Sequence, residues 1–161
     1  MIAAPGCRCP SNANYTLWIG ADVSSRQFEC LVERTYHELG YYTRLTPPQK
    51  DGGRDILADQ SVPSRRERLL IECKRYSKPV SVCLLRSLLG VVSSEKANKG
   101  VLVTSSHFTR AAVAFGHDNP RLELIDGPTL ASLMNEHLGP TWLTRIDRLV
   151  VESERQHFKA S

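Results

Sequence analysis

The stretch RLLIECKRY, residues 68–76, decides how this sequence folds, because it is an apolar run interrupted by regularly placed charges. Alternate side chains of a β-strand share one face, so Glu72 and Lys74 lie side by side. Both faces of the run carry apolar residues, which is typical of a central strand covered on both sides. A buried charge is unfavourable unless it is paired, hydrogen-bonded or bound to a metal ion. The sequence therefore predicts a central strand in which these two charges have a specific chemical role.

The segment before this strand begins with a helix. Ser24 and Gln27 form a capping-box pattern, and Gly40 provides the stop. On this helix Glu29 lies about 100° from Phe28, at the edge of the apolar stripe, so its carboxylate can face the interior. The apolar stripe itself follows helical spacing and comprises Phe28, Leu31, Val32, Tyr36 and Leu39.

Short elements connect the helix to the central strand. The pattern predicts strands at 41–46 and 55–59, with a glycine-containing turn at 47–54 between them. Residues 60–67, QSVPSRRE, are predicted to form a basic loop.

After the central strand, helical and strand patterns alternate. Ser81 is predicted to cap a helix that runs to about Asn98, and Gly90 within it indicates close packing. The later elements are a buried strand at 100–104, a helix at 107–117, a strand at 122–125 and a helix from Pro128 to Gly139. This order predicts an α/β fold with a mixed central sheet flanked by helices on both faces.

Length and composition indicate one globular domain with two flanking segments. Residues 1–23 show no periodicity and are predicted to be irregular, while residues 139–161 form a tail that is either helix or strand. No apolar run reaches the ~18 residues of a membrane helix, and no signal-peptide pattern opens the chain, so we expect a cytoplasmic protein. The net charge of +4, from 21 basic and 17 acidic residues, suits a polyanionic partner.

The five cysteines do not indicate a disulfide framework or a zinc site. Their number is odd, and Cys73 and Cys83 lie in apolar surroundings, where cysteine acts as a small hydrophobic residue. Cys7 and Cys9 lack a second pair of ligands at zinc-site spacing, so we expect no structural zinc.

A candidate metal site follows from the placement of two carboxylates. Asp55 begins a strand directly after the turn KDGGRD, and Glu72 lies on the next predicted strand. If these strands pair as a hairpin, the two carboxylates meet, with Lys74 beside them. Oxygen ligands suit a hard divalent cation such as Mg²⁺, and an ammonium group can stabilise a phosphate or an attacking hydroxide. The alternative is a structural aspartate beside an ordinary Glu–Lys pair.

Five blocks of the sequence resemble, in order, the catalytic domain of Mrr-like restriction endonucleases, a branch of the PD-(D/E)xK nuclease superfamily. The resemblance covers about residues 24–138, which we treat as the Mrr-like nuclease domain. It implies a restriction-endonuclease-like core, a DNA substrate and magnesium-dependent hydrolysis, with Mn²⁺ as a possible substitute. The blocks are FECLVERTYHELGY, DGGRDI, ECKRY, GVVSSEKANKGVLVTSSHFTRAA and ELIDGPTLASLM.

The resemblance also assigns residues. Asp55, Glu72 and Lys74 match the catalytic trio, Glu29 matches an accessory acidic position, and the Cys73 backbone carbonyl is implied as a further metal ligand. Arg54 stands where the superfamily has a proline, a replacement common in this branch. Glu72 stands where many Mrr-like members have glutamine, and this additional anionic ligand favours a working metal site.

The resemblance suggests the nuclease component of a restriction-type defence system. The alternatives are a repair or junction-resolving nuclease and a non-catalytic module that binds DNA or a protein partner. Because the flanking segments are short, we expect target choice to come from a separate recognition or sensor protein, from a homo-oligomer, or from sequence-independent phosphate binding. The predicted DNA-binding residues are Arg65, Arg66, Lys78, Lys96 and Lys99.

Overall fold

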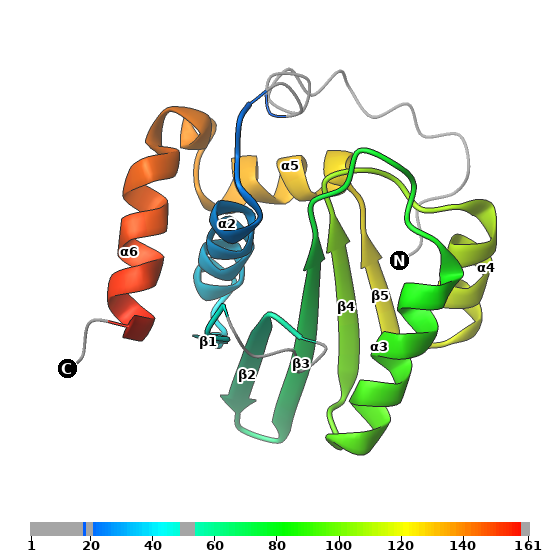
Figure 1. Ribbon diagram of the computed structural model, residues 1–161. Helices are drawn as coiled ribbons and strands as arrows, with labels where there is room; N and C mark the ends of the chain where they lie inside the picture. The colour runs from blue at the N-terminus through cyan, green and yellow to red at the C-terminus, as the bar shows by residue number, and fades with distance from the viewer. Residues whose placement is uncertain (1–17, 19–20, 49–53, 159–161) are drawn as a thin grey trace.

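A five-stranded sheet with helices on both faces forms the framework of the molecule (Figure 1). The computed structural model describes residues 18, 21–48 and 54–158. The elements are α2 (Ser25–Glu38), β1 (Tyr42–Leu45), β2 (Ile56–Val62), β3 (Arg65–Lys74), α3 (Val82–Ser94), β4 (Lys99–Thr104), α4 (Arg110–Asp118), β5 (Leu122–Ile125), α5 (Gly127–His137), the 3-10 helix η1 (Trp142–Arg145) and α6 (Ile146–Phe158).

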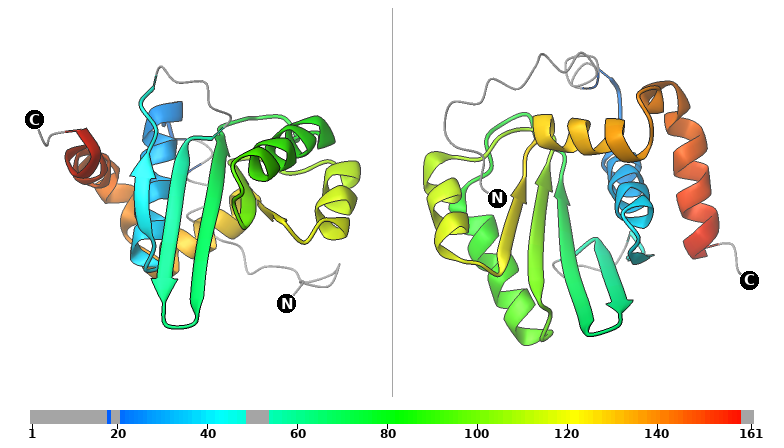
Figure 2. Two further views of the ribbon diagram at one scale, coloured as in Figure 1. Left: turned by 90° about the horizontal axis from the view of Figure 1, so that it is seen from below. Right: turned by 180° about the vertical axis from the view of Figure 1, so that it is seen from behind.

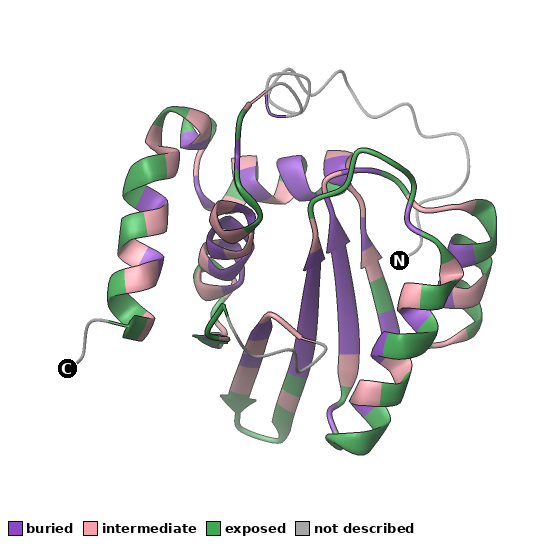
Figure 3. Ribbon diagram, viewed as in Figure 1, coloured by how far each residue is buried: buried purple, intermediate pink, exposed green. Residues whose placement is uncertain are grey.

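The sheet is mixed, as predicted. Its strands lie in the order β1-β2-β3-β4-β5, with antiparallel pairs from β1 to β3 and parallel pairs from β3 to β5. The strand predicted to be central, β3, is the third of the five. Its residues from Leu69 to Cys73 are buried, and Figure 3 shows the same burial along most of β4. The prediction of a mixed sheet built around residues 68–76 is confirmed.

Two apolar clusters pack on the two faces of the sheet. One contains Ile71 of β3 and the buried faces of α2 and α5, and the other contains Leu70 and the buried faces of α3 and α4. Figure 2 shows the sheet between these two groups of helices. Neighbouring residues of β3 therefore contact different cores, which is why both faces of its buried part carry apolar residues.

The N-terminus of α2 has the predicted capping box. The Gln27 backbone N–H donates to Ser24 Oγ at 3.2 Å, and the Ser24 N–H donates to Gln27 Oε1 at 2.8 Å. These bonds satisfy two groups at the helix end and fix where α2 begins. The face of α2 that carries Phe28 and Leu31 is buried as expected, and Glu29 lies beside it with 20% of its side chain exposed.

Residues 60–67 form a β-hairpin, so the prediction of a basic loop was wrong. β2 continues to Val62, and β3 begins at Arg65 after a two-residue turn in which Ser64 has a φ of 73°. Charged side chains across this ladder pair with each other: Arg68 Nε lies 2.8 Å from Asp59 Oδ1. Charge composition indicated a loop, but cross-strand ion pairs allow an exposed ladder to carry the same charges.

Helix α3 begins where it was predicted but ends earlier. Ser81 is the N-cap residue, but its side chain makes no capping hydrogen bond. The helix ends at Ser94 rather than Asn98, because the chain then turns back toward β3. Asn98 is used in that return: its backbone N–H donates to the Arg68 carbonyl at 2.9 Å, and the Arg68 N–H donates to Asn98 Oδ1 at 2.7 Å.

The expectation that Gly90 is required for close packing is wrong, whereas Gly100 is closely packed. A Cβ on Gly90 would have no atom within 4 Å, but one on Gly100 would lie 2.7 Å from Val92 Cγ2 and 2.8 Å from Leu88 Cγ.

We expect Gly90→Ala to raise the free energy of unfolding by about 1 kcal/mol, since alanine favours a helix interior. Gly100→Ala should lower it by about 1–3 kcal/mol through overpacking. Urea denaturation measures the free energy of unfolding of both variants, and a change of the same sign and size in both would contradict the packing argument.

The C-terminal segment, left open between helix and strand, forms η1 and α6. Trp142 is fully buried and Leu149 nearly so, and both join the cluster on the α2 face of the sheet. Trp18 stacks on Phe28 with ring centroids 5.6 Å apart and meets Trp142 edge-on at 5.9 Å. Segments from both sides of the predicted nuclease region thus contribute to one core.

Some expectations lie outside the described residues. Cys7 and Cys9, most of the irregular segment 1–23 and most of the turn at 47–54 are among the residues whose structure is not described. Within residues 18, 21–48 and 54–158, no helix combines the length and the apolar character needed to cross a bilayer.

Candidate active site

Asp55 directly precedes β2, and the antiparallel pairing of β2 with β3 sets it against β3. Because Ile56 pairs with Ile71, the position before Ile56 lies opposite Glu72. The Asp55 N–H donates to the Ile71 carbonyl at 2.9 Å, and Asp55 Oδ2 accepts a 2.6 Å bond from the Cys73 N–H. The hairpin postulated from the sequence is therefore present, and it brings the first carboxylate to the strand that carries the second.

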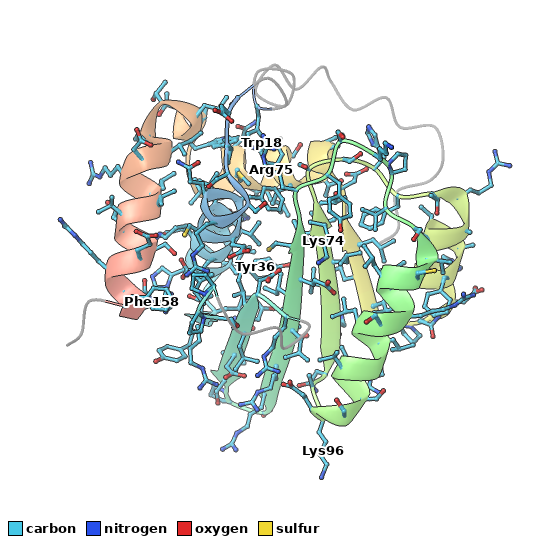
Figure 4. All side chains as sticks on the ribbon, in the orientation of Figure 1. Trp18, Tyr36, Lys74, Arg75, Lys96 and Phe158 are labelled. Carbon is cyan, nitrogen blue, oxygen red and sulfur yellow. The ribbon has the colours of Figure 1, made fainter. Side chains whose placement is uncertain are left out.

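Glu72 and Lys74 form an ion pair on the same strand. Lys74 Nζ lies 2.8 Å from Glu72 Oε1, with 26% and 11% of the two side chains exposed. Lys74 is the last residue of β3, and Figure 4 shows it where the strand leaves the sheet. This pairing is the neighbouring placement that two-residue spacing predicts, and it satisfies both charges while leaving the ammonium group partly accessible.

Glu29 approaches the same place from α2. Its carboxylate is near enough that the negative charge of Asp55 raises its pKa and the positive charge of Lys74 lowers it. Arg26, one helical turn earlier, donates to Glu29 Oε2 at 2.8 Å. The four residues predicted from sequence are thus contributed by one helix and two adjacent strands.

Burial dominates the electrostatics of the three carboxyl groups. It raises the pKa of Glu29, Asp55 and Glu72, because desolvation disfavours the charged form. The hydrogen bond from Cys73 opposes this effect on the pKa of Asp55, and the Lys74 hydrogen bond opposes it for Glu72. Burial alone would lower the pKa of Lys74, but the hydrogen bond and the charge of Glu72 raise it. Concentrated negative charge at partly buried positions is typical of functional sites.

The available donors suit a hard divalent cation that completes its shell with other oxygen atoms. Two carboxylates, of Asp55 and Glu72, meet at the ends of their strands, and the Cys73 carbonyl belongs to the residue next to Glu72. Within the described part of the chain, no three His, Cys, Asp or Glu side chains form a metal-binding group. Mg²⁺ is commonly bound by one or two carboxylates plus waters and substrate phosphates, so this donor set fits it. Cys73 is buried, and burial raises its thiol pKa well above the usual value, so its sulfur is unsuited to metal binding.

The structure separates the predicted DNA-binding residues from one another. Lys78 lies in the loop just after Lys74, close in sequence to the trio. Arg65 and Arg66 lie at the tip of the β2–β3 hairpin, nine and eight residues before Lys74, which is about 30 Å along the strand. Lys96 and Lys99 precede and begin β4. Lys96 lines a surface groove of about 680 Å³ together with Arg66 and Arg68.

Sequence reasoning missed Arg26. Its guanidinium donates to Glu29 and also to the Thr46 carbonyl at 3.0 Å, so it links α2 to the segment that leads to Asp55. The i, i+3 spacing of Arg26 and Glu29 was a detectable signal, because such residues are neighbours on a helix. Thr46 lies 20 residues away in sequence, however, and only the folded chain shows that link.

Two threonine hydroxyl groups near the C-terminal end of β4 accept local hydrogen bonds. Thr109 caps α4, accepting a 3.2 Å bond from the Ala112 N–H, and Thr104 Oγ1 accepts from the Ser106 N–H at 3.1 Å. These hydroxyls have local structural partners. Arg54, which replaces the superfamily proline, forms an ion pair with Glu95 at the end of α3.

Comparison with known families gives a match across most of the chain. The family described as restriction endonuclease, Mrr_cat, matches residues 21–134. The type IV methyl-directed restriction enzyme EcoKMrr of Escherichia coli (strain K12) is 31% identical over 119 residues, which are 71% of this chain and 39% of that protein. An uncharacterized protein, y4cE, of Sinorhizobium fredii is 30% identical over 89 residues, 54% of this chain and 23% of that protein. The chain therefore spans well under half the length of these relatives.

Solved structures show the same architecture. The DNA modification-dependent restriction endonuclease AspBHI superposes with a TM-score of 0.71 at 19% identity, covering 97% of this chain and 43% of that one. The restriction endonuclease MspJI, solved with a 27-mer oligonucleotide, gives a TM-score of 0.60 at 23% identity, covering 88% of this chain and 34% of that one. At these identities the likeness shows a shared fold.

Proposed function

Because the chain belongs to the Mrr_cat family of restriction endonucleases, we propose that it is a magnesium-dependent DNA endonuclease serving a restriction-type defence system. The proposal is supported above all by the proximity of Asp55, Glu72 and Lys74, which lie where the start of β2 pairs with the end of β3. Glu29 adds a third carboxylate from α2. Three desolvated carboxyl groups beside one ammonium group destabilise the metal-free fold, and a function at this position accounts for them.

Each residue of the cluster has a role in this proposal. Asp55, Glu72 and the Cys73 carbonyl would hold the cation, which polarises the phosphodiester and acidifies a bound water. Lys74, fixed by its 2.8 Å pair with Glu72, would stabilise the charge that develops on the phosphate or the attacking hydroxide. Because the Cys73 N–H donates to Asp55 Oδ2, the other carboxylate oxygen, Oδ1, would be the one to bind the cation. Mn²⁺ would substitute for Mg²⁺ because both prefer oxygen ligands.

Target choice would come from protein outside this domain. The relatives are longer than the matched region; EcoKMrr is described as methyl-directed and AspBHI as DNA modification-dependent. We infer that modified DNA is the substrate of this protein and that a recognition or sensor element, in the same assembly, directs the cut. Cleavage of both strands would use two copies of the domain in a homo-oligomer. A cytoplasmic location follows from such a role.

The two groups of basic residues suggest the path of the duplex. Lys78 would contact phosphates beside the scissile bond, whereas Arg65 and Arg66 would contact the backbone about 30 Å away, or roughly nine base pairs. Lys96 and Lys99 would contact phosphates near the second group. These contacts would be independent of base sequence, because phosphates carry no sequence information directly.

Cleavage of supercoiled plasmid by the purified chain tests the proposal. We expect nicking and linearisation with Mg²⁺ or Mn²⁺ and none with EDTA. Methylated and unmethylated plasmid should be cut at equal rates, because the recognition element outside this domain would read the modification. A preference for branched junctions over either plasmid would instead assign the site to a repair or junction-resolving nuclease. Binding of DNA with no cleavage under any metal, by a folded chain, would favour a non-catalytic module.

A further inference from the structure

Arg26 joins two parts of the candidate site. Its guanidinium donates to Glu29 Oε2 at 2.8 Å and to the Thr46 carbonyl at 3.0 Å, and 22% of its side chain is exposed. The Thr46 N–H in turn donates to the Asp55 carbonyl at 2.8 Å. Arg26 therefore connects the helix that carries Glu29 to the segment beside Asp55. Burial raises the pKa of both carboxyl groups, and the positive charge of Arg26 opposes that rise.

The last residue of α6 covers this arginine. The Arg26 guanidinium carbon lies 5.1 Å from the centre of the Phe158 ring, within the range of a cation–π contact. Figure 4 labels Phe158 at the end of α6, and Figure 1 shows α6 beside α2. Helix α6 lies beyond residue 134, where the family match ends. Helix α6, which lies outside the matched region, therefore contacts Arg26, the hydrogen-bond partner of Glu29.

A buried polar network holds this end of α6 in place. Glu33 of α2 is fully buried and accepts hydrogen bonds from Thr43 of β1 and, at 2.6 Å, from Ser153 of α6. His157 Nε2 lies 3.1 Å from Glu33 Oε1. His157 directly precedes Phe158, so the Ser153–Glu33 hydrogen bond and the burial of the His157 side chain beside Glu33 restrict the backbone next to the aromatic ring. The position of Phe158 over Arg26 is thus set by buried contacts rather than by the exposed end of the helix alone.

We propose that Phe158 positions Arg26 and that Arg26 holds the Glu29 carboxylate beside Asp55 and Lys74. Helix α6 would then contribute to the geometry of the nuclease site. The proposal rests on the proposed function only for its effect on cleavage. An arginine side chain has many rotamers, and the ring restricts them to those that reach Glu29. Without the ring, Glu29 would lose a fixed partner while remaining partly buried.

Two measurements on full-length variants test this positioning role. We expect Phe158→Ala to lower kcat for plasmid about two- to fivefold with KM for DNA unchanged, as a cation–π contact of this exposure predicts. In metal-free protein, carbon-13 NMR titration of the Glu29 carboxyl should show a raised pKa, because the Arg26 interaction that lowers it is weakened. Phe158→Trp should restore both values, since tryptophan is the best ring for this contact.

A matched control exists on the other face of the sheet. Phe115 lies 5.6 Å from the guanidinium carbon of Arg86, a contact of the same kind between α4 and α3. Phe115→Ala should change neither kcat nor the Glu29 pKa. If Arg26 acts through Glu29, then Arg26→Ala should cause no further loss of kcat in a Glu29→Gln background, although it lowers kcat in the wild type.

The outcomes separate this inference from the proposed function. An unchanged Glu29 pKa in Phe158→Ala overturns the inference, and so does an equal change in Phe115→Ala, which would indicate a general loss of stability. If the wild-type chain cuts no DNA, the nuclease proposal fails. The NMR titration still decides whether Phe158 and Arg26 hold Glu29.

Discussion

Asp55→Asn is expected to reduce metal-dependent plasmid cleavage by at least about 10²- to 10³-fold. The amide can still accept the bond that the Cys73 N–H donates to Asp55 Oδ2, so the local fold should persist. What disappears is one of the two negative charges that would hold the cation. Initial rates on supercoiled plasmid in Mg²⁺ and in Mn²⁺ measure the loss.

The same substitution should stabilise the metal-free protein at pH 7, by about 1 kcal/mol or ~2–4 °C in Tm. Burial raises the pKa of Asp55, so charging this group costs more in the folded than in the unfolded chain. The cost is absent below the unfolded pKa of about 4 and grows as the pH rises through the folded pKa. Thermal unfolding in EDTA should therefore show a higher Tm for the variant at pH 7 and equal values near pH 3.

Asp59→Asn supplies the matched control, because Asp59 lies on β2, four residues after Asp55, but pairs with Arg68 on the hairpin. It should keep wild-type cleavage and gain no stability. Addition of Mg²⁺ should raise the Tm of the wild type and of Asp59→Asn but not of Asp55→Asn. An equal metal effect in all three proteins would contradict Asp55 as a ligand.

Lys74→Met is expected to reduce cleavage by about 10²- to 10³-fold, since methionine keeps the volume but removes the ammonium group. It should also lower the free energy of unfolding by about 1–3 kcal/mol. Glu72, with 11% of its side chain exposed, would lose the partner that lies 2.8 Å away. Plasmid cleavage and urea denaturation measure the two effects.

The double variant Glu72→Gln with Lys74→Met separates the two roles of Lys74. Neutralising Glu72 removes the unpaired charge, so stability should recover toward the wild-type value while cleavage stays absent. Recovery of cleavage in the double variant would contradict a chemical role for the ammonium group. Failure of stability to recover would mean that the pair is not the source of the loss.

Local patterns predicted much of this architecture because the forces involved act over a few residues. The capping box at Ser24 and the apolar run at 68–76 each need only near neighbours and a buried face to be recognised. The two-residue spacing of Glu72 and Lys74 likewise predicted their ion pair. The order of the elements then restricted the sheet to a mixed one.

Predictions that depended on distant partners were wrong or missing. Gly90 was expected to be closely packed, yet Gly100 is the glycine against which Leu88 and Val92 pack. The charged residues of the β2–β3 hairpin predicted a loop at 60–67, because their ion-pair partners lie on the neighbouring strand and not nearby in sequence.

The sequence by itself determined which residues form the candidate site: the positions of Asp55, Glu72 and Lys74 follow from a turn and from strand spacing. Only the tertiary structure decided what surrounds them. Glu29 reaches the cluster because α2 packs against the sheet, and Arg26 is held by Phe158, 132 residues later, because buried contacts of Glu33 fix the end of α6. Such contacts join residues that are distant in sequence, so they depend on how the helices pack against the sheet and cannot be predicted from a local pattern.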